Sequence, residues 1–588
     1  MGTILARTSR RLLLRSRGGS QGEGATSSRF HPPSHRPPRG TRMLTSILLL
    51  MLALPHGGEF QPPLDPEQPG APPAFPTQPG TGPVAVFSAA RWEWWFDFNQ
   101  EGLLRLRERM TTRATPEGER PYLAVTDRLR LRRVLPVLVH ALRHRHRDVR
   151  SSATMSLGRL GLASAVPYIE TMLEDPDLFV RTQALLAMGM TAQPAAVEPL
   201  SAVLADTGRD VEGRIFAAVA LGLVANPDAV DVLRGWLAPK RLNKLKNQLR
   251  WGLVYAAGVS RSPELVPPLL ALADTWQWQH DATMRSLGAV ALGQIGSEQT
   301  LPALLSLLGD KHNQVRRSAA AGLERAGSHL SAQDVERLIA HERDENDWPA
   351  RLNLIRALGA SDEPAALRHL TDVLQHSTSL VRPHAALALG MRGHPSSAPV
   401  LLETLADQHE MSTRGALVLA LGLLGSPEAR PVLAGMLERA SDPAFAGYLA
   451  LSLGLLGDAG PEVIEALMEL ASERHDVETV KLATYGLALL GARTRVDRLA
   501  TELDDGGLGT MDQAARLFAL GQVGDARTLG VLLKAAVSDE RPTYVVRYAI
   551  GALGDLCDPR PVSPVWRLSR HVELNLHVDI LFELYRTL

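Results

Sequence analysis

The sequence predicts an all-α protein: an α-solenoid, a superhelical array of about 13 helical hairpins, behind a disordered N-terminal leader. Three observations support this prediction. A short phrase rich in Ala, Leu and Gly recurs about every 33 residues through most of the 588-residue chain. Within each copy, the apolar residues are spaced as on one face of a helix. Aromatic residues make up only 5% of the chain, so small aliphatic side chains must form the core.

The composition excludes several classes of protein. Lys plus Arg and Asp plus Glu both number 63, so the chain is not a globally basic nucleic-acid binder, and we expect no nucleic acid as a partner. Cys557 is the only cysteine, which excludes an intrachain disulfide and an all-cysteine metal site.

The leader divides into three segments by composition. Residues 1–42 are low-complexity and Arg-rich, and we expect that they are not translated and that the true start is Met43. Residues 43–56 contain the apolar run LTSILLLMLAL, which is typical of a signal peptide and too short to span a bilayer comfortably. Residues 57–90 form a linker rich in Pro and Gly. We therefore expect export, to a periplasm or outside the cell. A buried helix, an organelle transit peptide and an uncleaved membrane anchor at 44–54 remain open.

The repeated phrase has a glycine at the same place in most copies. The glycines are Gly158, Gly189, Gly222, Gly258, Gly293, Gly359, Gly390, Gly422, Gly454, Gly521 and Gly554, and two further copies have Glu324 and Ala488 at this place. A fixed period of this length is typical of a solenoid, in which each unit buries its apolar faces only by stacking on its neighbours.

One copy illustrates the hairpin. Val149, Ala153 and Leu157 are four residues apart and share a helical face. A Gly-x-x-Gly sequence then ends the helix and permits a tight turn. The second helix often has proline near its beginning, as at Pro167, where the missing N–H costs no hydrogen bond.

An arginine lies eight residues before the phrase position in nine successive units. These are Arg150, Arg181, Arg214, Arg250, Arg285, Arg316, Arg351, Arg382 and Arg414. A basic stripe for an anionic polymer is one interpretation. We favour a structural ladder of contacts between neighbouring repeats, because an acidic residue is within reach of each arginine.

The phrase and the proline-led second helix resemble the HEAT repeat family, in particular the short repeats of phycobilisome lyases. The resemblance covers roughly 127–588, with the solenoid at 127–571. Exported bacterial HEAT proteins with a Pro/Gly-rich leader are similar. The resemblance implies a non-catalytic binding or scaffolding protein that recognises an unidentified protein partner through its concave surface. The alternative is a HEAT-like enzyme of the bilin-lyase or di-iron hydroxylase type.

Two long intervals between repeats carry unusual residues. One holds Lys240, Arg241, Lys244 and Lys246, and the other holds Trp276 and Trp278. A cationic loop beside an aromatic loop suits an anionic ligand, although exposed charge and gap-filling tryptophans are ordinary features of repeats. Residues 128–150 hold eight arginines, which form either a solvated face or an anion-binding patch. A metal shared by His140 and His144, four residues apart, is a third alternative.

Both ends of the array have segments that could cover it. Residues 91–126 begin with RWEWWFDFN, which contains Trp92, Trp94 and Trp95. This segment is either an N-terminal cap or a docking peptide. Residues 572–588 are expected to form a C-terminal capping helix.

A search for catalytic motifs gives little. The pairs His341-Glu342 and His409-Glu410 resemble those of HEAT-type di-iron hydroxylases, but they lie out of phase with the phrase. We expect no metal, no cofactor and no catalytic residue. Membrane contact is expected only if segment 44–54 is uncleaved.

Overall fold

The computed structural model describes residues 91–457, 459–472, 476–503, 507–564 and 566–569. The chain divides into two units, 1–47 and 48–588, and every described residue belongs to the second. The expected leader, linker and final helix (1–90 and 572–588) lie outside the described residues. The described residues form helices and turns, and no strand occurs among them, which confirms the all-α prediction.

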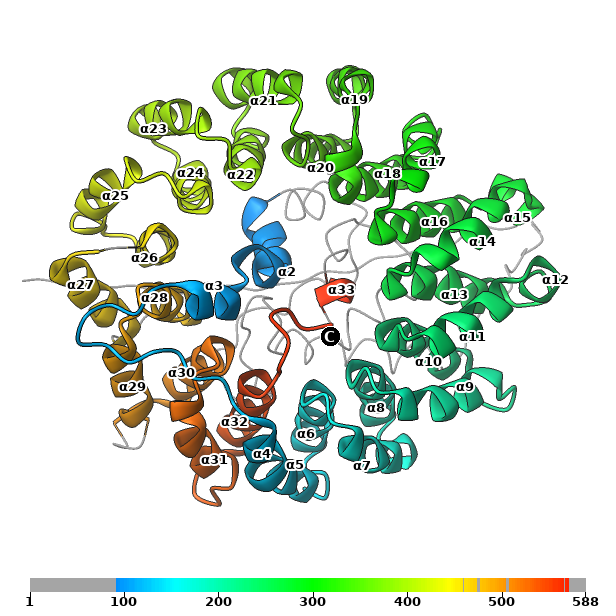
Figure 1. Ribbon diagram of the computed structural model, residues 1–588, viewed down its shortest axis with the longest axis horizontal. Helices are drawn as coiled ribbons and strands as arrows, with labels where there is room; N and C mark the ends of the chain where they lie inside the picture. The colour runs from blue at the N-terminus through cyan, green and yellow to red at the C-terminus, as the bar shows by residue number, and fades with distance from the viewer. Residues whose placement is uncertain (1–90, 458, 473–475, 504–506, 565, 570–588) are drawn as a thin grey trace, which may run out of the picture. The chain divides into compact units, whose positions relative to one another are not determined.

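Thirteen inner helices carry the repeated phrase, and an outer helix precedes each of them (Figure 1). The inner helices are α6 (Arg147–Arg159), α8 (Leu178–Met190), α10 (Val211–Val224), α13 (Asn247–Ser260), α16 (Ala282–Ile295), α18 (Asn313–Ala326), α20 (Trp348–Gly359), α22 (Arg382–Arg392), α24 (Met411–Leu424), α26 (Pro443–Leu456), α28 (Val477–Leu489), α30 (Thr510–Val523) and α32 (Thr543–Leu556). The number of hairpins in the described part of the chain therefore agrees with the prediction.

Most outer helices are shorter than the inner helices, and about half have a proline as their first or second residue. They are α5 (Leu135–Ala141), α7 (Val166–Thr171), α9 (Val197–Ala205), α11 (Pro227–Leu237), α14 (Val266–Leu270), α17 (Leu301–Leu307), α19 (Ala332–Asp344), α21 (Pro364–His376), α23 (Ser397–Asp407), α25 (Ala429–Leu437), α27 (Pro461–Ser472), α29 (Arg493–Thr501) and α31 (Leu529–Ala536). Additional short elements are α4 (Asp127–Leu129), the π-helix η1 (Arg130–Val134), α12 (Pro239–Leu242) and α15 (Trp276–His280). Proline fits the first turn of a helix, where its nitrogen has no hydrogen bond to lose.

Neighbouring inner helices touch at the phrase glycine. A Cβ atom built on Gly390 would lie 2.5 Å from the carbonyl oxygen of Ala420, and one on Gly158 would lie 2.5 Å from that of Ala187. The partner is in each case the residue two positions before the phrase position of the next inner helix. The repeat therefore needs glycine at one position and a small residue two positions earlier, because the backbones themselves are in contact.

The same contact joins the last repeat to the first. A Cβ on Gly554 of α32 would lie 2.8 Å from the Cα of Ser156 in α6. The Ser156 hydroxyl donates to the carbonyl of Ile550 at 2.9 Å, and Arg159 and Asp555 form a buried ion pair at 2.9 Å. The array therefore closes on itself, with α32 beside α6 (Figure 1). We expected residues 91–126 to cover the open face of the first repeat. In the structure α32 covers that face instead.

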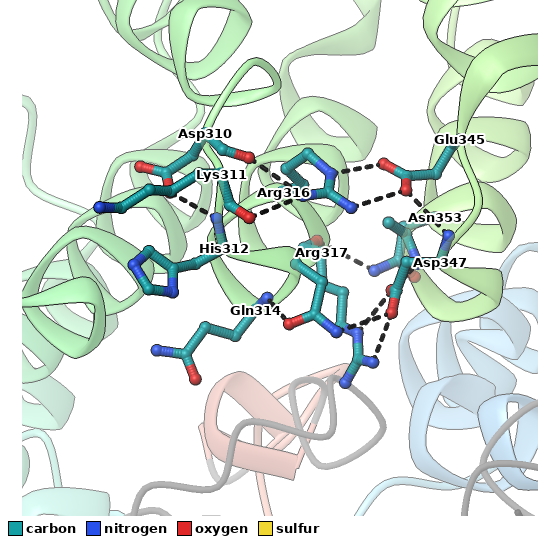
Figure 2. Close-up of polar contacts among 11 residues, drawn as sticks. Asp310, Lys311, His312, Gln314, Arg316, Arg317, Glu345, Asp347 and Asn353 are labelled. Carbon is teal, nitrogen blue, oxygen red and sulfur yellow. Dashed lines mark hydrogen bonds and ion pairs between the residues drawn. The ribbon is translucent and has the colours of Figure 1, made fainter.

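An arginine of the ladder can make two kinds of contact. One is with the turn before the helix that carries it, and the other is with the corresponding turn of the next repeat. Figure 2 shows Arg316, which donates to the carbonyl of Asp310 at 3.0 Å. Its Nε and Nη2 atoms donate to both carboxylate oxygens of Glu345 at 2.8 and 2.9 Å. Beside it, Arg317 binds Asp347 through two hydrogen bonds of 2.6 Å.

Other ladder members repeat part of this pattern. Arg150 pairs with Asp175, and Arg285 pairs with Asp310. Arg181 donates instead to the carbonyls of Asp175 and Pro176, which belong to the preceding turn. The capping of the preceding turn is thus more general than the ion pair with the next repeat.

We predict opposite effects for two Gly→Ala substitutions. Gly390→Ala should destabilise the fold by about 1–3 kcal/mol, because its Cβ would press on the backbone of α24. The control Gly235→Ala, in α11, meets no atom within 4 Å and should stabilise the fold by about 0.5–1 kcal/mol through helix propensity. Urea denaturation measures both changes. A neutral Gly390→Ala would contradict the close helix contact.

We predict that Arg316→Gln lowers stability by about 2–3 kcal/mol at neutral pH, because Glu345 is left largely buried without its partner. Burial raises the pKa of Glu345, but the hydrogen bonds from Arg316 outweigh it and hold the pKa below its ordinary 4.5. The pair therefore stabilises the fold above pH 4.5, and this contribution is lost as the pH falls through the lower folded-state pKa. Denaturation at neutral and acidic pH should show the two proteins converging in acid. Arg343→Gln, at an exposed position nearby, is the control.

Candidate functional site

The N-terminal helix of the described chain lies inside the array. Figure 1 shows α2 (Trp92–Leu104) surrounded by inner helices, with the short α33 (Trp566–Ser569) in the same region. The indole N–H of Trp92 lies 2.9 Å from the carbonyl oxygen of Ser412, and its ring centroid lies 4.9 Å from that of Tyr448. The guanidinium of Arg356 stands 5.2 Å from the centre of the Trp95 ring.

The segments next to α2 and α33 bind the carboxyl ends of inner helices. Arg113, after α3 (Leu106–Thr112), donates to the carbonyls of Gly454 and Leu489 at 2.5 and 2.7 Å. Arg107 donates to the carbonyl of Asp558 at 2.6 Å, and Arg560 donates to that of Arg159 at 3.2 Å. Positive side chains suit these helix ends, where the backbone carbonyls are negative and lack partners within the helix.

This arrangement changes the role expected of the concave surface. The sequence suggested that a partner would bind there. Instead, α2 packs on α24 and α26 through Trp92, and Gln294 of α16 donates to the carbonyl of Arg567 in α33 at 3.2 Å. Parts of the inner surface are therefore covered by the chain itself.

A small polar cavity lies between α2, the last three inner helices and the turn that leads to α33. Its volume is about 50 Å³, which leaves room for a few water molecules. The lining includes Glu101, Tyr485, Gln522, Asp555 and Trp566. It therefore brings carboxyl groups from distant parts of the chain to one interior space.

Glu101 lies on the wall of this cavity, near the end of α2. Burial raises the pKa of its carboxyl from 4.5 to about 7, although the backbone N–H of Ser563 donates to it and partly opposes the shift. The negative charges of Asp558 and Asp555 raise it further. The side chain keeps some accessible surface because it lines the cavity, but protein surrounds the carboxyl on all sides.

Asp555 lies at the end of α32 and is 5% exposed. Burial raises the pKa of its carboxyl from 3.8 to about 6, and the positive charges of Arg159 and Arg107 limit the rise. Burial also raises the pKa of the Tyr485 phenol well above 10, so this hydroxyl stays protonated. The cavity thus combines a proton donor with two carboxyls that titrate near neutral pH.

The two carboxyls influence each other electrostatically, so their titrations belong to the pair. Between pH 6 and pH 7, the pair therefore holds about one proton. A donor and an acceptor of protons then line the same cavity, which is the arrangement that general acid–base catalysis requires.

The two His-Glu pairs do not form an iron site. The Glu342 carboxylate is buried and accepts hydrogen bonds from Arg351 at 2.7 Å and from His369 at 2.8 Å. Glu410 lies two hairpins further along the chain, directly before α24, and its carboxylate accepts a hydrogen bond from the hydroxyl of Thr413. Across the described ranges, no group of three or more His, Cys, Asp or Glu side chains is placed to hold a metal ion. The residues present therefore do not fit a di-iron centre.

The residues proposed from the sequence as partner contacts fall into two groups. Lys240, Arg241, Lys244 and Lys246 are exposed, and the Arg241 guanidinium stacks 3.4 Å from the centre of the Trp236 ring. An anionic ligand at this loop stays a prediction.

The tryptophans differ in exposure. Trp92 and Trp95 are about 1% exposed, and Trp278 is 9% exposed against Gly288. Trp94 is half-buried beside Phe98, and Trp276 lies in α15. The buried three fill space between helices, so their placement does not support docking of a partner.

The sequence analysis missed Glu101, Asp555 and Arg159. A signal for two of them exists. Arg159 and Asp555 occupy the position directly after the phrase glycine, where most copies have an apolar residue or Gln. Asp555, in the last copy, is the one acid at this position, and arginine stands there in two copies, at Arg159 and Arg325. A contact between the first and last copies was therefore one of two ion pairs that the pattern allowed. Nothing in the pattern marks Glu101.

Comparison with known proteins supports the repeat assignment. A family model described as HEAT repeats matches residues 135–213, 238–324, 279–347, 335–416 and 410–488, which together exceed half of the chain. The complex of CpcE and CpcF of the phycocyanin lyase from Nostoc is a structural neighbour, with 20% identity and a TM-score of 0.27. The match covers 50% of this chain and 93% of that chain.

Two curated relatives are enzymes. Deoxyhypusine hydroxylase from Danio rerio is 26% identical over 242 residues, which cover 32% of this chain and 79% of the relative. Deoxyhypusine hydroxylase from Aspergillus clavatus is 24% identical over 312 residues, which cover 51% of this chain and 80% of the relative.

These relatives correct two expectations from the sequence. We expected a non-catalytic binding or scaffolding protein and no enzyme. Both expectations are wrong by this comparison. The comparison supports the alternative given above, a HEAT-like enzyme. The repeat assignment itself is confirmed by the extent of the family match. The chain belongs to the HEAT repeat family.

Proposed function

We propose that the chain is an enzyme that transfers protons between its substrate and the carboxyls of Glu101 and Asp555 in the interior cavity. The observation that carries this proposal is the pair of carboxyls, with pKa values of about 7 and about 6, on the wall of one small cavity. Strongly shifted pKa values cluster at functional sites, because a general acid or base works best when its pKa is near the working pH.

Addition and elimination reactions suit this arrangement. Such a reaction removes a proton at one atom and supplies a proton at another. Asp555, when ionised, is the acceptor, and Glu101, when protonated, is the donor. Of the two enzyme types that the family resemblance raised, a lyase-type reaction therefore fits these residues best. The cavity admits only a small reacting group unless α2 moves.

Hydroxylation of deoxyhypusine is a second candidate, supported by the names of the two curated relatives. We derive no step through iron, because the His-Glu pairs of this chain do not converge. A peptide carrying deoxyhypusine, incubated with the protein and Fe²⁺, tests this candidate. A gain of one oxygen in the peptide mass supports it, and an unchanged mass contradicts it.

We predict a bell-shaped dependence of the reaction rate on pH, with its maximum between pH 6 and pH 7. The full chain is incubated with a metabolite extract, and mass spectrometry follows the compounds consumed and formed. Glu101→Gln should slow the conversion at least about 100-fold, because the proton donor is lost. Glu170→Gln, at an exposed position of α7, is the control. Conversion that Glu101→Gln leaves unchanged would contradict the proposal.

We predict that Glu101 makes the fold less stable as the pH rises. Below pH 4.5, its carboxyl is protonated in both the folded and the unfolded state. Between pH 4.5 and pH 7 only the unfolded state ionises, so stability falls, by up to roughly 3 kcal/mol once the pH exceeds 7. Urea denaturation at pH 5 and pH 8 measures this loss. Glu101→Gln should abolish most of it, and an unchanged pH dependence would show that Glu101 ionises normally.

A further inference from the structure

Five exposed arginines flank the first outer helix, α5. We call this set the basic face, and it consists of Arg128, Arg132, Arg133, Arg143 and Arg145. These residues lie on α4, η1 and the turn after α5, and all five are exposed. No ion pair is recorded for any of them within the described part of the chain, although most ladder arginines have an acidic or carbonyl partner.

The buried side of the same helical segment explains why the arginines point outward. Val134 and Leu138 are fully buried against the first repeat. Arg130 alone turns inward, where it donates to the carbonyl of Leu160 at 2.8 Å and pairs with Asp127. Asp127 is the only acidic residue between positions 127 and 147, so arginines far outnumber acids in this segment.

Two exposed leucines lie in the same segment of the chain or just before it. Leu131 is 42% exposed between Arg130 and Arg132, and Leu123 is 51% exposed just before α4. Large exposed apolar residues are few in the described chain, and these two leucines are not needed for binding a soluble anion. Arginines beside exposed leucines are typical of segments that lie at the surface of an anionic bilayer.

We propose that the basic face binds the headgroups of an anionic lipid surface, with Leu131 and Leu123 entering its outer layer. A single-stranded nucleic acid fits less well, because residues 123–145 contain no Phe, Tyr or Trp that could stack on a base. The binding is peripheral, and no helix in the described part of the chain is long and apolar enough to cross a membrane. The proposal is independent of the interior cavity.

Vesicle sedimentation with the full chain tests this proposal. The vesicles are phosphatidylcholine alone and phosphatidylcholine with phosphatidylglycerol. Each arginine near an anionic surface should strengthen binding about fivefold. The triple variant Arg128→Gln, Arg132→Gln, Arg133→Gln should therefore lose at least tenfold in affinity for the anionic vesicles. Its melting temperature should not change, because the three side chains are exposed. Added salt should weaken the binding of the unaltered chain.

A second triple variant, Arg343→Gln, Arg368→Gln, Arg439→Gln, is the matched control. It removes the same charge from exposed positions elsewhere on the chain and should keep at least half of the binding. Equal losses in the two triple variants would show that only net charge matters and would overturn the proposal. Leu131→Ser separates lipid from other anions: it should weaken binding to anionic vesicles several-fold and leave binding to duplex DNA unchanged. Tight duplex binding combined with no effect of Leu131→Ser on vesicles would assign the basic face to nucleic acid instead.

Discussion

The direct contact between the backbones of neighbouring inner helices is the constraint on which the structure depends. A glycine of one helix lies against a small residue of the next, and this contact recurs along the array and again between α32 and α6. The helices can approach so closely only where no side chain intervenes, so the core is built from Ala, Leu and Gly. The outer helices, the arginine ladder and the closed arrangement all follow the spacing that this contact sets.

The repeats could be predicted from the sequence because each one is defined locally. The phrase fixes the inner helix, the proline marks the outer helix, and Arg316 has its partners in the adjacent turns. Closure could not be predicted in this way, because Ser156 and Ile550 meet across 394 positions of the chain. The period gives the number of residues in each unit. Whether the two ends of the array meet depends on the small rotation between neighbouring units, and this rotation cannot be deduced from the repeat pattern.

The candidate site escaped prediction for a related reason. Glu101 comes from a helix outside the repeats, whereas Asp555 and Arg159 come from the two repeats that meet at the closure. Their raised pKa values depend on burial by segments hundreds of residues apart, which no local motif reports. The sequence analysis interpreted the aromatic segment as an N-terminal cap or a docking peptide. It overlooked Glu101, whose carboxyl lies on the same helix and lines the interior cavity. The curated relatives are enzymes, whereas the resemblance to HEAT repeats had implied a binding protein.

Closure has an evolutionary consequence. An open solenoid can gain or lose a unit at an end, or duplicate one internally, because its overall curvature need not satisfy any boundary condition. In this chain Arg159 must reach Asp555, and Gly554 must reach Ser156, so the accumulated rotation of all units has to return to its starting point. Insertion or deletion of a single unit would leave a wedge-shaped mismatch. Divergence should therefore proceed by substitution and by changes in loop length, while the number of units stays fixed.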